Sequence, residues 1–168
     1  MDRLWATWRM AYITGKHKDT GCVFCNAPKS TKDEEVLILH KGSHCFIIMN
    51  LFPYNNGHVM VIPYRHTSDI TTLTDEESFE MMKFVRIMTK AIKKSLNPEG
   101  FNIGMNIGRP GGAGIADHLH MHIVPRWTGD TNFMPVIGET RVISEHLEAT
   151  YNKLYTTLQE ELKNDKNI

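Results

Sequence analysis

The chain has 168 residues, and its 19 basic and 19 acidic side chains give a formal net charge of zero at pH 7. This balance argues against a protein dominated by nucleic-acid or membrane electrostatics, and no apolar run reaches the roughly 18 residues that a membrane span needs. Hydrophobic residues make up 41% and charged residues 23%, which is typical of one globular domain over residues 1–168. Because a signal-peptide core is also missing, we expect a cytoplasmic protein whose partners are neither nucleic acids nor membranes.

The N-terminal extension, residues 1–34, contains a pair of cysteines. Cys22 and Cys25 have the Cys-x-x-Cys spacing, and Cys45 is the third cysteine of the chain. An odd number of cysteines with this spacing favours thiol or metal chemistry over a disulfide framework. A structural zinc site needs four ligands, so a metal site and a pair of free thiols both remain open at this point.

Five short stretches have the composition of β-strands and are separated by turn-forming residues: 36–40, 44–49, 58–63, 101–107 and 117–125. One long helix interrupts them. It begins after Thr74, which forms a capping-box signature with Glu77. Its apolar residues keep a helical spacing from Phe79 and Met82 onward, and we expect this stripe, including its methionines, to face the core. A second helix is expected at about 144–163. Because the strands follow one another mostly without helices, we predict an α+β domain with an antiparallel sheet.

Three histidines recur at every second position near the end of the strand pattern. His118, His120 and His122 alternate with apolar residues, and this period predicts that the three imidazoles share one face of a strand. Each buried imidazole has two ring nitrogens to satisfy. The stretch is therefore a metal site, a nucleophilic histidine held by its neighbours, or a half-exposed strand that happens to be rich in histidine.

A glycine-rich loop, residues 108–116, precedes the three histidines. Glycines permit positive φ angles and let backbone N–H groups approach a ligand closely. The loop alone is a weak signal. Joined to the histidine strand, it predicts an anion-binding cradle beside a reactive group.

These motifs resemble the histidine triad (HIT) family of nucleotide-binding hydrolases and transferases. The family pattern His-φ-His-φ-His-φ-φ, with φ apolar, is matched by residues 118–124, and a second block, which ends in Gly-His-φ-φ-φ-x-Pro, is matched by residues 50–63. The resemblance extends over residues 8–155. It implies a five-stranded antiparallel sheet with two helices and assembly into a homodimer.

The resemblance also implies a reaction and a set of site residues. In the HIT family the middle histidine attacks the α-phosphorus of a nucleotide and forms a covalent nucleotidyl-histidine, so His120 is the expected nucleophile. His122 is expected to contact the scissile phosphate or its leaving group. His118 and His58 complete the catalytic set. The positions expected to contact the substrate, besides His122, are Asn50, Asn106, Gly111, Gly112, Ala113, Gly114, Ile115 and Trp127.

One departure from the family pattern bears on the phosphate acceptor. Many HIT hydrolases carry a glutamine four positions before the first triad histidine, where this chain has Gly114. The missing side chain leaves room for a second anion. The extension around Trp127, together with residues 8–12, resembles the diadenosine polyphosphate phosphorylases and hydrolases. We therefore expect cleavage of dinucleoside polyphosphates, such as diadenosine tetraphosphate, at the α-phosphate, with inorganic phosphate favoured over water as the acceptor.

Several HIT proteins complete a zinc site with two histidines, and the resemblance extends this site to the present chain. The implied ligands are Cys22, Cys25, His66 and His118, with His44 and Cys45 as substitutes. The zinc would be structural and would tie the N-terminal segment to the active-site strand. No organic cofactor is expected.

Three other functions remain open. The triad histidines could bind a catalytic metal, although three ligands from one strand seldom converge on one ion. The chain could instead hydrolyse nucleoside phosphoramidates or nucleotide esters. It could also be a non-catalytic nucleotide-binding module.

Overall fold

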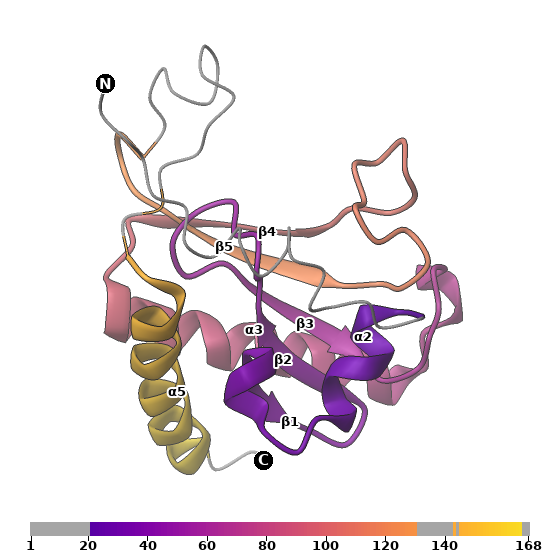
Figure 1. Cartoon of the computed structure of the whole chain (residues 1–168), viewed down its shortest axis with the longest axis horizontal. Helices are drawn as coiled ribbons and strands as arrows, with labels where there is room; N and C mark the ends of the chain where they lie inside the picture. Colours follow the sequence, from indigo (N-terminus) through magenta and orange to yellow (C-terminus); the bar gives the residue numbers. More distant parts are fainter. Residues whose placement is uncertain (1–20, 131–142, 144, 166–168) are drawn as a thin grey trace.

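The computed structural model describes residues 21–130, 143 and 145–165. Five strands form one antiparallel sheet with the order β1-β2-β3-β5-β4 (Figure 1): β1 Ile38–Lys41, β2 Cys45–Met49, β3 Val59–Pro63, β4 Gly100–Met105 and β5 Met121–Arg126. The α-helices of the described chain are α2 Val23–Asn26, α3 Asp75–Leu96 and α5 Leu147–Asn164, and the 3-10 helices are η1 Ala27–Lys29, η2 Asp33–Val36 and η3 Ile70–Thr72. The predicted α+β fold with a five-stranded antiparallel sheet is confirmed. The short helix α2 was not predicted.

The two faces of the sheet are covered by different elements. Side chains on one face of β2 and β3, including Ile47 and Val61, pack with α3 and α5 in the larger apolar cluster. Their neighbours in sequence point the other way, and Phe46 and Ile62 pack with Phe24 of α2 in a second cluster. This alternation follows from the period of two along a strand. Strands β2 and β3 are therefore buried on both faces.

The long helix α3 starts at the predicted capping box. The Thr74 hydroxyl accepts a hydrogen bond from Glu77 N (3.2 Å), and the Glu77 carboxylate accepts one from Thr74 N (2.9 Å). The prediction that Phe79 and Met82 belong to the core face is wrong, because they are 71% and 56% exposed. The buried apolar residues of α3 begin at Met81 instead, one position away from Met82. Several stripes of this helix satisfy the spacing of three and four, and only packing against the sheet selects one of them.

The hairpin between β1 and β2 is held by α3. Glu80 accepts hydrogen bonds from the backbone N–H groups of Ser43 (3.0 Å), His44 (2.6 Å) and Cys45 (2.6 Å). Gly42 is required at the turn, since a Cβ there would lie 2.4 Å from the Phe84 ring. One carboxylate thus fixes the hairpin to the helix.

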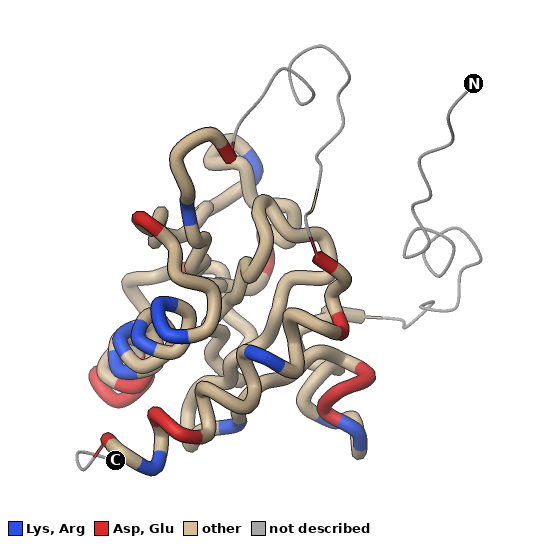
Figure 2. The backbone as a smooth tube through the Cα atoms, turned by 90° about the vertical axis from the view of Figure 1, so that its left-hand side faces the viewer, with Lys and Arg blue, Asp and Glu red and all other residues tan. Residues whose placement is uncertain are grey.

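Ion pairs connect α3 with the C-terminal helix. Lys94 pairs with Glu160 (2.7 Å), and Arg86 pairs with Asp165 (3.0 Å). Figure 2 shows both basic and acidic residues on the described chain, as the zero net charge requires. None of the described helices is long and apolar enough to cross a membrane.

Strand β5 begins later than predicted. It starts at Met121, so only His122 of the three histidines lies within the strand. Met121 is the first residue of β5 that pairs with β4, opposite Met105. Before that point the chain is held by a hydrogen bond from Leu119 N to Thr67 O (2.7 Å) rather than by a strand. The expectation that all three histidines lie on one strand is therefore wrong for His118 and His120.

Candidate active site and metal cluster

Four buried histidines come together where β3 and β5 lie side by side. His58 is 0% exposed, and the three triad histidines are 1–6% exposed. His58 immediately precedes β3, and His122 lies on β5 opposite Met60 of β3. His58 lies 64 residues before His122 in the sequence, and the antiparallel pairing of β3 with β5 brings the two together. Their burial means that each ring nitrogen needs a defined partner.

Hydrogen bonds fix the proton positions of His58 and His122. The Tyr54 backbone N–H donates to His58 Nδ1 (3.0 Å), and Asn50 Nδ2 lies 3.3 Å from the same atom. Because the Asn50 Oδ1 already accepts from Phe52 N (2.9 Å), its amide nitrogen faces the imidazole. A neutral His58 that accepts at Nδ1 carries its proton on Nε2. It therefore donates to His122 Nδ1, 2.9 Å away.

The arrangement leaves one N–H group without an acceptor. Since His122 accepts at Nδ1, the neutral ring carries its proton on Nε2. This atom is buried and has no hydrogen-bond partner in the described part of the chain. Burial, and then the nearby charge of His120, lower the pKa of His122 to about 4. His122 is thus a neutral donor directed into the site.

His120 has the opposite tautomer to His122. Its Nδ1 lies 2.9 Å from the main-chain oxygen of His118, and a carbonyl only accepts, so Nδ1 carries the proton and Nε2 keeps a lone pair. Burial lowers the pKa of His120 from its usual value, and the ring is therefore neutral at pH 7 and can carry a charge only at lower pH. The rings of His120 and His122 meet edge to face with centroids 4.7 Å apart. A nucleophilic nitrogen consequently lies beside an N–H donor.

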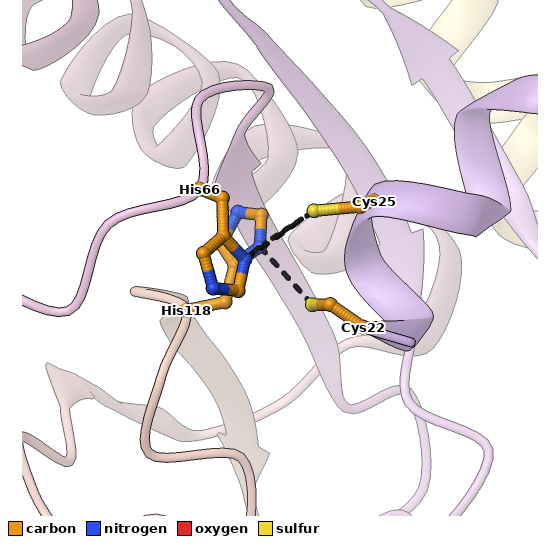
Figure 3. Close-up of side chains that lie close together, drawn as sticks. All are labelled: Cys22, Cys25, His66 and His118. Carbon is orange, nitrogen blue, oxygen red and sulfur yellow. Dashed lines mark hydrogen bonds between the residues drawn. The ribbon is translucent and has the colours of Figure 1, made fainter. Parts of the chain in front are cut away.

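The predicted zinc ligands form one cluster, which Figure 3 shows with both thiols facing the imidazoles. Cys22 Sγ lies 3.3 Å from His118 Nδ1, and Cys25 Sγ lies 3.3 Å from His66 Nδ1 and 3.6 Å from His118 Nδ1. The two Nδ1 atoms are 3.2 Å apart. Zinc bound at about 2.3 Å to sulfur and about 2.0 Å to nitrogen in a tetrahedron separates its ligand atoms by roughly 3.3–3.8 Å. The four residues fit such a site.

His118 is prepared as a ligand by its second nitrogen. Its Nε2 donates to Pro63 O (2.9 Å), so the lone pair of Nδ1 faces the two thiols. Metal-binding histidines usually have such a partner on the other ring nitrogen. The alternative ligand Cys45 lies apart, buried on β2 with its Sγ 3.6 Å from Glu77 O. In the triad only His118 belongs to the metal cluster, because the Nδ1 atoms of His120 and His122 face His118 O and His58.

The glycine-rich loop uses part of its own backbone. Gly111 N and Ala113 N donate to Gly108 O, and Gly112 N donates to Arg109 O. Gly111 must be glycine, since a Cβ would lie 2.4 Å from Ile107 O. The backbone donors that remain for a bound anion in this expected phosphate loop therefore belong to its second half, which contains Gly114.

Comparison with known proteins decides the family. The HIT domain model matches residues 31–129. The chain belongs to the HIT family. A Mycobacterium tuberculosis protein named AP-4-A phosphorylase is 40% identical over 164 residues, which cover 93% of this chain and 84% of that protein. An adenosine 5′-monophosphoramidase of Schizosaccharomyces pombe is 31% identical over 105 residues, which cover 62% of this chain and 74% of that protein.

Solved HIT structures agree with the fold. A zinc-bound histidine triad family protein from Mycobacterium smegmatis aligns with a TM-score of 0.70 and 25% identity, and the alignment covers 86% of this chain and 98% of that one. A histidine triad nucleotide-binding protein from Sulfolobus tokodaii aligns with a TM-score of 0.65 and 26% identity, covering 85% and 93%. The expected HIT fold is thereby confirmed.

Not every residue expected from the HIT pattern lies near the histidines. Asn106 follows β4 at the end where Met105 pairs with Met121, which is the end that holds the triad. Trp127 follows the opposite end of β5 and lies five residues after His122, which corresponds to about 16 Å at the usual rise per strand residue. Its indole N–H donates to Asn97 O (3.2 Å). A role for Trp127 in substrate binding stays a prediction.

Two residues that contact the HIT histidines were not expected from the sequence. The Tyr54 ring lies 4.5 Å from the His58 ring and 5.4 Å from the His122 ring. Phe24 lies 5.1 Å from the His120 ring. Tyr54 precedes His58 by four residues within the second family block, and Phe24 lies between the two cysteines. These positions are the only signals for them in the sequence.

Proposed function

We propose that this chain cleaves dinucleoside polyphosphates, such as diadenosine tetraphosphate, at the α-phosphate through a covalent nucleotidyl-His120. The observation that carries the proposal is the pairing of a neutral His120, whose Nε2 keeps its lone pair, with a His122 that presents a buried N–H. The similarity to the mycobacterial AP-4-A phosphorylase supports this choice of substrate.

The proposed reaction has two displacement steps. In the first, His120 Nε2 forms a bond to the α-phosphorus while the bond to the leaving nucleoside polyphosphate breaks, and that group departs as an anion. The His122 N–H donates a hydrogen bond to a phosphate oxygen, where negative charge develops. In the second step, an oxygen of inorganic phosphate or water attacks the same phosphorus and His120 is released. With diadenosine tetraphosphate the first step releases ATP, and the second releases ADP with phosphate or AMP with water.

The remaining site residues would bind and orient the nucleotide. We assign phosphate contacts to the second half of the glycine-rich loop, Gly114 and Ile115, because the N–H groups of the first half are bound within the loop. Asn106 lies at the triad end of the sheet and is a further candidate contact. The Asn50 amide is already bonded to Phe52 and His58, so we assign it to holding His58 as well as to the substrate.

We propose inorganic phosphate as the preferred acceptor, and Gly114 offers a direct test. A Cβ built at Gly114 meets no atom within 4 Å, so Gly114→Gln adds a side chain to open space. With diadenosine tetraphosphate, the wild-type enzyme is expected to release ADP with ATP in the presence of phosphate. Gly114→Gln is expected to lower phosphate-dependent turnover more than water-dependent turnover, whereas Gly114→Ala should change the ratio little. AMP as the main product of the wild-type enzyme at saturating phosphate would refute the phosphate preference.

The nucleophile has its own test. His120→Ala removes the attacking nitrogen and is expected to abolish turnover while the affinity for a non-hydrolysable nucleotide remains. Nucleotide-labelled protein trapped by acid quench should be present in the wild type and absent in His120→Ala. An active His120→Ala enzyme would refute the covalent route. Turnover of a nucleoside phosphoramidate but not of diadenosine tetraphosphate would instead favour the second candidate, which the monophosphoramidase relative supports.

We propose that the Cys/His cluster holds a structural zinc ion. Its ligand separations suit a tetrahedral ion, and the zinc-bound Mycobacterium smegmatis protein supports this choice of metal. When bound, zinc would cross-link α2 to the loop after β3 and to the residues before β5. We also propose a cytoplasmic location, where reducing conditions would keep the two thiols available.

A homodimer is the proposed assembly. Strand β4 lies at one edge of the sheet, and Ile103 on it is 45% exposed. An exposed apolar edge strand is a natural site for pairing with a second copy. Light scattering should give twice the chain mass for the wild type, and Ile103→Lys should shift it toward the monomer.

A further inference from the structure

Phe24 lies between the two cysteines and against the expected nucleophile. It is 5% exposed, and its ring centroid lies 5.1 Å from that of His120 at an interplanar angle of 51°. The same ring meets His118 edge to face at 5.6 Å. One aromatic side chain therefore contacts both the nucleophile and a residue of the metal cluster.

The contacts of His120 show why a packed neighbour matters. The hydrogen bond from Nδ1 to His118 O restrains one atom of the ring, but small rotations about the two side-chain torsions can still tilt the ring. The ring centroid of His122 lies 4.7 Å from that of His120, and the ring centroid of Phe24 lies 5.1 Å from it. Together these neighbours restrict the direction in which Nε2 points. An error of about 1 Å in the position of a reacting atom can lower a rate on the order of 100-fold.

The helix that carries Phe24 cannot position it alone. Helix α2 has four residues, and its N-cap residue Cys22 makes no side-chain capping hydrogen bond. An isolated turn of this length is unstable in water. In the described part of the chain, α2 is joined to the sheet and to the active-site histidines by the apolar contacts of Phe24 and Ala27 and by Cys22 and Cys25, which face His118 and His66.

We propose that Phe24 is a positioning residue for His120, and that the Cys/His cluster keeps it in place. The inference rests on the proposed function, since it assigns a partner to the nucleophile of that reaction. The cluster holds His120 through two contacts. The main-chain oxygen of His118, one of the cluster residues, accepts the His120 Nδ1 hydrogen bond, and Phe24, which lies between the two cysteines, packs against the His120 ring.

The first test separates positioning from packing. Phe24→Leu is compared with Phe84→Leu, a matched loss of a buried ring on the opposite face of the sheet, where Phe84 is 3% exposed. Phe24→Leu is expected to lower kcat with little change in KM, and Phe84→Leu to leave kcat unchanged. Phe24→Ala, if it folds by circular dichroism, should lower kcat on the order of 100-fold. An unchanged kcat in Phe24→Leu, or an equal loss in Phe84→Leu, would overturn the inference.

The second test measures the coupling to the metal cluster. Chelation of zinc from the wild type is expected to lower kcat, but chelation from Phe24→Leu should lower it by a smaller factor, because the contact that the cluster holds is already lost. Equal factors in both proteins would show that Phe24 does not carry the effect.

A spectroscopic measurement completes the design and needs no turnover. The His120 Nδ1 proton should give a slowly exchanging downfield NMR signal in the zinc-loaded wild type and in Phe84→Leu. The signal should be lost by exchange in Phe24→Leu. Its persistence there would count against the inference. The result is distinguishable from failure of the proposed function, because that function is tested by the activity of His120→Ala and by the substrate that is turned over, and not by this signal.

Discussion

His58 Nε2 lies 2.9 Å from His122 Nδ1, and the backbone N–H of Tyr54 donates to the far side of the same His58 ring. This chain of donors assigns the proton of each imidazole without any carboxylate. A main-chain amide thus determines which nitrogen of His122 carries the proton.

Replacing His58 is expected to slow the reaction more than it weakens binding. His58→Leu removes the donor to His122 Nδ1, so His122 can turn or adopt the other tautomer. We expect kcat to fall by about 10²-fold, as for loss of a positioned proton donor, with little change in KM. His40→Leu on β1 is the matched control, since the His40 ring packs against Phe84. Wild-type kcat in His58→Leu would contradict the prediction.

The buried state of His122 should make stability depend on pH. Its pKa is lowered to about 4, mainly by burial, whereas an unfolded histidine titrates near 6.5. Between these values the unfolded chain binds the proton and the folded chain does not. The stabilisation is therefore complete above pH 6.5 and is lost as the pH falls toward 4, by about 3 kcal/mol.

Urea denaturation of the wild type and of His122→Asn at several pH values measures this contribution. The free energy of unfolding should fall more steeply in the wild type over this range, because the variant lacks the titrating ring. Parallel pH dependences in the two proteins would show that His122 is not responsible.

The metal cluster predicts one zinc ion per chain in the purified protein. Cys25→Ser should lose the metal and lower the melting temperature, because ligand binding to the folded state is folding free energy. Cys45→Ser should retain the metal, since this thiol lies on β2 and faces Glu77 O. Elemental analysis and thermal melting of the two variants check the prediction. Equal zinc content in both would refute the ligand assignment.

Glu80 should be important for stability and not for catalysis. Its carboxylate accepts three backbone N–H groups of the β1–β2 turn, and hydrogen bonds to a charged group are stronger than neutral ones. Glu80→Gln removes the charge and is expected to lower the free energy of unfolding by about 1–2 kcal/mol. Glu34→Gln, at an exposed position, should have little effect. Chemical denaturation tests this difference, and wild-type stability of Glu80→Gln would contradict it.

Local patterns account for what was predictable from the sequence. The Thr74–Glu77 capping box and the hydrophobic runs of the strands depend on neighbours in sequence. The candidate metal cluster of Cys22 and Cys25 with two histidines was expected from the HIT pattern. The buried face of α3 was not predictable in the same way. Phe79 and Met82 satisfy the helical spacing but face solvent, because the position of the sheet decides which stripe is covered.

In the candidate site, too, some residues were predictable from a sequence motif and others only from tertiary packing. The family motif indicated His58 and the triad, and the structure brings these histidines together. The contacts of Tyr54 and Phe24 with them arise only from tertiary packing. His122 lies near the start of β5 and Trp127 lies after its end. A sequence motif that continues along an extended strand therefore does not show how far its residues lie from one another.

The partner of His120 Nδ1 is a main-chain oxygen rather than a side chain. No single substitution can delete this oxygen or exchange it for a carboxylate. The contribution of this hydrogen bond to the basicity of the proposed nucleophile is therefore insulated from point mutation at its acceptor, and it changes only if the backbone around residue 118 moves. Sequence changes elsewhere in the site can therefore leave the tautomer of His120 unchanged, because the acceptor that sets it belongs to the main chain.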